Sequence, residues 1–164
     1  VVPGEIGMLL IAKKGKAHDK RDRLEYVRKD GTRSEIEMPR QGILPHDLVH
    51  CVVEQAFGYQ EGFMGRVAAG ASPQFAESSD LARTRALTLA ESAVEAMQTQ
   101  LASGQFDHAA FAYGFEMACA MREVYDAVIP EPRIAAEAFR QARDLNDAWR
   151  AVPPMHTLEV EFLE

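Results

Sequence analysis

The sequence predicts an α+β fold, in which a small antiparallel sheet packs against about four helices within a single domain spanning residues 1–164. Two patterns predict this class. Apolar and polar residues alternate with the period of a strand near both ends of the chain, and apolar residues recur with the helical period over most of its middle. With 164 residues, 47% of them apolar, the chain is long enough to bury one core, and a split into two domains is not expected.

The N-terminal part is predicted to form strands. Residues 7–12 are a candidate strand, and residues 24–38 alternate in polarity around an Asp30-Gly31 turn, which is typical of a β-hairpin. Residues 13–23 include eight charged residues among eleven, so we expect a solvated loop there.

A first helix is predicted over residues 45–57. Pro45 suits the first helical position because its missing N–H would have no partner there, and Gly58 is a typical stop. Residues 58–71 are rich in glycine and alanine and fit either a short helix or a loop packed on the core.

A long helix is predicted to begin at a cap on Ser78 or Ser79 and to end at Gly104. Its apolar residues recur at heptad-like spacing: Leu87, Ala90, Val94, Met97 and Leu101. We interpret this stripe as packing within the domain, with homodimerisation as the alternative.

The C-terminal part is predicted to hold two more helices and a strand. Residues 109–121 are almost wholly apolar, so this helix is expected to be buried on most of its circumference. A last helix follows over residues 134–149, and Pro153-Pro154 ends it. Residues 157–162 alternate in polarity, which predicts an edge strand that returns to the sheet.

The charge and cysteine content exclude several classes of protein. A formal net charge of −7 repels phosphate backbones, so no nucleic-acid partner is expected. The longest apolar run, residues 8–12, is far shorter than the roughly 20 residues that cross a bilayer, so no membrane partner is expected. Cys51 and Cys119 form no C-x-x-C pair, which argues against a disulfide framework or a thiolate zinc site and favours a reducing cytoplasm.

One short segment indicates chemistry. Residues 45–50 read Pro-His-Asp-Leu-Val-His, which places His46 and His50 one turn apart on the same face of a helix. Two imidazole nitrogens so placed can bind one metal ion, and imidazole suits zinc, iron, nickel or copper. The expected cofactor is therefore a divalent transition metal, with zinc foremost.

Two carboxylates are candidates for a third ligand. Glu54 continues the row of His46 and His50 along the edge of the buried face, but eight residues of helix rise about 12 Å, so one ion reaches all three only with strain. Glu116 is the single charge among residues 109–121, and a buried carboxylate needs a cation or several hydrogen bonds. A salt bridge between Glu116 and an arginine is the alternative interpretation.

Asp47 also has two interpretations. In the first turn of a helix, exposed N–H groups and the helix dipole stabilise a carboxylate, typically by about 0.3–1 kcal/mol. Alternatively, Asp47 is catalytic, like the glutamate that follows the first histidine of the H-E-x-x-H metalloprotease helix and acts as general base. Because its side chain is one methylene shorter, it suits better the role of hydrogen-bond partner to an imidazole N–H.

His46, Asp47 and His50 resemble the H-D-x-x-H motif of the coenzyme Q biosynthesis family. In that family a glutamate follows after eleven further residues, and the resemblance implies zinc binding by the matching residues. This chain has Gly62 at the position of that glutamate, and Glu61 comes one residue earlier. That family is essentially helical, whereas this chain has predicted strands at both ends, so its pathway role is not transferred.

The function expected from these residues is metal binding by His46 and His50, completed by Glu54 or Glu116. Whether the domain is an enzyme stays open; its enzymatic form would be a metal-dependent hydrolase of a small polar substrate, with Asp47 as base or orienting partner. The alternative is a non-catalytic structural or interaction module, with a homodimer among its forms, in which His46 and Asp47 only terminate a helix.

Overall fold

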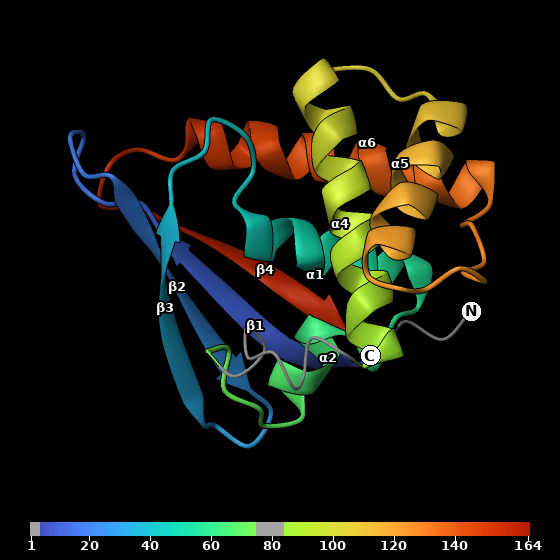
Figure 1. Ribbon diagram of the computed structural model, residues 1–164. Helices are drawn as coiled ribbons and strands as arrows, with labels where there is room; N and C mark the ends of the chain where they lie inside the picture. Colours follow the sequence, from blue (N-terminus) through green and yellow to red (C-terminus); the bar gives the residue numbers. More distant parts are fainter. Residues whose placement is uncertain (1–3, 75–83) are drawn as a thin grey trace.

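The computed structural model describes residues 4–74 and 84–164 and confirms the α+β class. A four-stranded antiparallel sheet in the order β3-β2-β1-β4 carries the helices on one of its faces (Figure 1). Both ends of the chain contribute to this sheet, since the N-terminal strand β1 pairs with the C-terminal strand β4.

The strands lie where the polarity pattern predicts them. β1 (Ile6–Lys13) lies between β2 (Arg21–Arg28) and β4 (Thr157–Leu163), and β3 (Arg33–Pro39) forms the hairpin with β2. The predicted N-terminal strand, hairpin and C-terminal edge strand are therefore confirmed. Alternate side chains of the sheet are buried: Met8, Leu10, Ala12, Leu24, Tyr26, Met38 and Phe162.

The charged loop is shorter than the predicted residues 13–23, because β2 already begins at Arg21. Asp22 is buried, and its carboxylate accepts hydrogen bonds of 2.9 Å from the Gly15 amide and from the Arg40 guanidinium. These partners satisfy the buried charge, so a charged residue can occupy an inward position of a strand.

The first helix, α1 (His46–Phe57), begins one residue later than predicted, so Pro45 is its N-cap and not its first helical residue. Gly58 ends it in the left-handed conformation, with φ of 69°, which glycine adopts without strain. The glycine-rich segment that follows contains a short helix, α2 (Phe63–Ala68), which is the first of its two predicted alternatives.

A long helix, α4 (Arg85–Ser103), packs across α1. The predicted caps at Ser78 and Ser79 lie outside the described residues. Gly104 ends the helix as predicted. The predicted apolar stripe packs within the domain: Leu87, Ala90, Val94 and Met97 are buried, and Leu101 is partly buried.

Two more helices complete the fold. α5 (His108–Met121) packs mainly on α4 and meets α1 only near Phe57, whose ring lies 6.0 Å from that of Phe111, whereas α6 (Pro132–Ala151) packs extensively against α1 (Figure 1). No helix in the described ranges is both long and apolar enough to span a bilayer.

The prediction that the apolar helix α5 is buried on most of its circumference is wrong. Tyr113 is 67% exposed and Met121 is 79% exposed, and Glu116 is exposed as well. The physical reason is that α5 lies in the outer layer, where only the side facing α4 and α6 is covered. Five of residues 109–121 are alanine, which an exposed helix face tolerates.

Candidate metal centre

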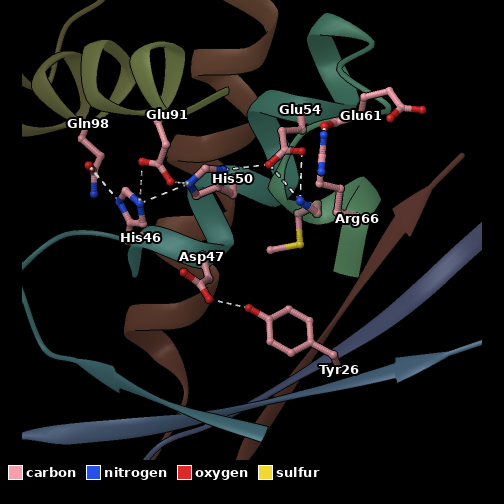
Figure 2. A network of polar contacts seen from close by, with 10 residues as sticks. Tyr26, His46, Asp47, His50, Glu54, Glu61, Arg66, Glu91 and Gln98 are labelled. Carbon is pink, nitrogen blue, oxygen red and sulfur yellow. Dashed lines mark hydrogen bonds and ion pairs between the residues drawn. The ribbon is translucent and has the colours of Figure 1, made fainter. Parts of the chain in front are cut away.

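Three side chains from two helices meet at one point. Figure 2 shows His46 and His50 of α1 facing Glu91 of α4. The His50 Nε2 atom lies 3.1 Å from His46 Nε2 and 2.9 Å from Glu91 Oε1, and His46 Nε2 lies 3.3 Å from Glu91 Oε2. Their potential ligand atoms all lie within 4.8 Å of one another. The i, i+4 spacing on α1 therefore brings the two imidazoles together as predicted, and α4 supplies a carboxylate.

These separations suit a single ion. Zinc binds imidazole nitrogen and carboxylate oxygen at about 2.0–2.2 Å, so two ligands at neighbouring corners of a tetrahedron lie about 3.3 Å apart. The separation of the two Nε2 atoms is 3.1 Å, and the nearest Glu91 oxygens lie 2.9 Å (Oε1, from His50) and 3.3 Å (Oε2, from His46) away, all close to that edge length. Only small side-chain movements are needed for all three groups to contact one ion.

The outward nitrogen of each imidazole faces this point because an acceptor holds the other nitrogen. His50 Nδ1 lies 2.8 Å from Glu54 Oε2, and His46 Nδ1 lies 3.3 Å from Gln98 Oε1. Both oxygens accept, so each Nδ1 carries a proton and donates it. The Nε2 atoms are thereby left as the atoms directed at Glu91.

The cluster lies where the α1–α4 contact reaches the surface. The His50 side chain is only 1% exposed, whereas the side chains of His46 and Glu91 are 42% and 37% exposed. His50 and Glu54, predicted at the edge of the buried face of the helix, are fully covered there by α4 and α2. His46 and Glu91 remain accessible from solvent.

The electrostatics of the cluster favour a cation. Burial opposes the charging of His50, but its hydrogen bonds to Glu54 and Glu91 outweigh that effect and raise its pKa to about 10. Burial likewise opposes the ionisation of Glu91, but its bonds to His46 and His50 hold its pKa below the ordinary range. In the metal-free protein, the proton on His50 Nε2 supplies the positive charge between the ring and Glu91. A bound metal ion would take the place of that proton.

Glu54, a predicted ligand, lies on the other side of the His50 ring. Both of its carboxylate oxygens accept from the Met64 N–H, at 3.0 and 3.1 Å, and one of them also accepts from His50 Nδ1. Glu54 is therefore not part of the three-residue group that could hold an ion. The predicted 12 Å rise between His46 and Glu54, about eight residues, is the physical reason.

Asp47 points away from the imidazoles, toward the sheet (Figure 2). It accepts a hydrogen bond from the hydroxyl of buried Tyr26, and burial together with the charge of Asp47 raises the pKa of Tyr26. Adjacent helical residues diverge by about 100°, so Asp47 does not reach the faces of His46 and His50. Its position in the first turn of α1 agrees with the helix-dipole interpretation.

The other predicted ligand, Glu116, is not brought to the cluster, since it lies exposed on the outer helix α5. Glu91 of α4 lies where Glu116 was predicted to lie, next to the two imidazoles. A signal for Glu91 does exist: Leu87, Glu91, Val94 and Gln98 follow one another at spacings of four, three and four, so Glu91 and Gln98 interrupt an otherwise apolar face of α4.

Comparison of the chain with protein-family models, with curated proteins and with solved structures finds no match. The assignment of function therefore depends on the geometry of the cluster.

Proposed function

We propose that this protein binds one divalent transition-metal ion, zinc foremost, through Nε2 of His46, Nε2 of His50 and the carboxylate of Glu91. The observation that carries the proposal is the convergence of these three groups at separations close to a tetrahedral edge, with each Nδ1 already engaged by an acceptor. Two nitrogens and one oxygen form a ligand set that suits zinc and iron(II).

A catalytic role is the finer form of this proposal. Structural zinc sites usually have four protein ligands, whereas catalytic sites have three and leave a position for water or substrate. Within residues 4–74 and 84–164 the cluster offers three ligands, two of which are partly exposed. The corresponding activity is hydrolysis of a small polar substrate, in which the ion polarises the bond that is broken.

A second candidate is a purely structural role. The same side chains hydrogen-bond to one another without an ion and so connect α1 to α4. In that case the cluster is a polar link between helices. Metal binding distinguishes the two candidates.

Titration of tag-free, chelator-treated protein with zinc chloride, followed by calorimetry, tests the proposal. We expect one zinc ion per chain, because the three ligand groups surround a single point. Metal analysis of the protein as purified checks the same stoichiometry without added zinc. Absence of binding at millimolar zinc, with the protein folded, would leave only the structural role.

The zinc affinity is expected to fall as the pH falls. Imidazole binds metals in its neutral form, and the pKa of His50 near 10 means that zinc must displace a proton from this ring at neutral pH. Each displaced proton weakens binding by about tenfold per pH unit. Titrations at pH 8, 7 and 6 check this, and equal affinity at the three values would contradict ligation by His50.

A further inference from the structure

The carboxylate of Glu54 on α1 is fully buried, which is uncommon for a charged side chain. The exposed fraction of the Glu54 side chain is 0%. One oxygen accepts from His50 Nδ1 at 2.8 Å, and both oxygens accept from the Met64 N–H of α2. Burying a carboxylate costs free energy that an apolar side chain of similar size would not. Its presence here points to a role that requires the charge.

The segment between α1 and α2 is shaped around this carboxylate. A Cβ atom built on Gly62 would lie 2.2 Å from Glu54 Oε1 and 2.8 Å from its carboxyl carbon. The Glu54 side chain is 0% exposed, and the Met64 N–H holds both of its oxygens. Gly62 therefore allows the carboxylate and the Met64 N–H to meet.

We propose that Glu54 is a positioning residue of the metal centre: it fixes the rotation of the His50 ring, keeps the proton on Nδ1 and directs Nε2 at the ion. This inference rests on the proposed metal site. The two ends of the ring face opposite carboxylates, Glu54 inside the protein and Glu91 at the cluster. A carboxylate on the inner nitrogen also increases the electron density that the outer nitrogen donates to a metal.

The variant Glu54→Gln tests the role, since it keeps the size of the side chain and one acceptor oxygen but removes the charge. Its amide N–H₂ would also face the Met64 N–H, donor against donor, in place of one oxygen. We expect zinc affinity about 10- to 100-fold weaker than in the wild type, the usual effect of losing a residue that orients a ligand. The visible spectrum of the cobalt(II)-loaded protein should shift as well, because the ring changes its orientation.

Two further variants make the test specific. Gly62→Ala replaces no side chain of the cluster; its Cβ would meet Glu54 Oε1 at 2.2 Å, far closer than its 3.1 Å approach to Ala90 Cβ, so it acts chiefly on the Glu54 carboxylate and should weaken zinc binding in the same direction. Glu61→Gln, the same chemical change at an exposed neighbouring residue, should bind zinc as the wild type does. Circular dichroism of the metal-free proteins identifies any variant that fails to fold.

The outcomes separate this inference from the proposed function. If the wild type binds zinc and folded Glu54→Gln binds it within twofold, with the same cobalt spectrum, the positioning role is wrong and the metal site stands. If Glu54→Gln does not fold, folded Gly62→Ala decides in the same way. If the wild type binds no metal, both proposals fail together.

Discussion

Replacing Glu91 by glutamine is expected to weaken zinc binding by at least about 100-fold while the metal-free protein stays folded. Loss of a residue that only orients a ligand already costs 10- to 100-fold, and Glu91 is proposed to touch the ion itself. The neutral amide also removes the single negative charge at the cluster and binds zinc poorly. Calorimetric titration of the variant with zinc chloride measures the effect.

The fold should tolerate this change, because the Glu91 side chain is 37% exposed and glutamine can still accept a hydrogen bond from His50. Glu95→Gln is the matched control: Glu95 lies one turn further along α4, is exposed and forms an ion pair with Arg122 at 2.9 Å. We expect Glu95→Gln to bind zinc as the wild type does. Equal affinity in Glu91→Gln and Glu95→Gln would exclude Glu91 as a ligand.

The parts of the site that depend on local sequence could be predicted. The helical spacing of His46 and His50 brings their rings together, and the end of the helix at Gly58 follows from glycine's access to the left-handed conformation. The strands were predictable for the same reason, because the alternation of polarity along the chain reflects burial of one face of the sheet.

The carboxylate that completes the cluster could not be predicted in the same way. Glu91 meets the imidazoles only because α4 packs across α1, and Glu116 is kept from them because α5 lies beyond α4. The interruption of the apolar face of α4 marks Glu91 as a candidate, but no local pattern says which helix that face meets. A buried charge was expected in the most apolar helix, but the apolar helix proved to be the outer one, with Tyr113 and Met121 exposed.

The row of His46, His50 and Glu54 on α1 runs from the surface into the core. The His46 side chain is 42% exposed, whereas the side chains of His50 and Glu54 are 1% and 0% exposed. The length of the row prevents one ion from contacting both ends, and it allows Glu54 to hold the inner nitrogen of His50 while the outer nitrogen faces solvent-accessible groups. The helical repeat thus supplies a ligand pair and its support from one stretch of sequence.

The two histidines should differ sharply when each is replaced by alanine. Both variants are expected to lose zinc binding, but only His50→Ala should strongly destabilise the metal-free protein. Removing the His50 ring leaves the buried Glu54 carboxylate without its charged partner, and breaking a buried pair in this way typically costs about 3–5 kcal/mol. His46 is partly exposed, and pairs of that kind contribute about 0–1 kcal/mol.

Urea unfolding in the presence of a chelator measures both effects, and the pH dependence gives a second check. The pKa of His50 is raised from 6.5 in the unfolded chain to about 10 in the folded protein, so its stabilising contribution is complete below pH 6.5 and is lost as the pH rises through 10. The difference in unfolding free energy between the wild type and His50→Ala should therefore be larger at pH 6.5 than at pH 9.5. If His50→Ala and His46→Ala lose the same small amount of stability at both values, His50 does not carry the buried charge on which the arrangement of the metal centre depends.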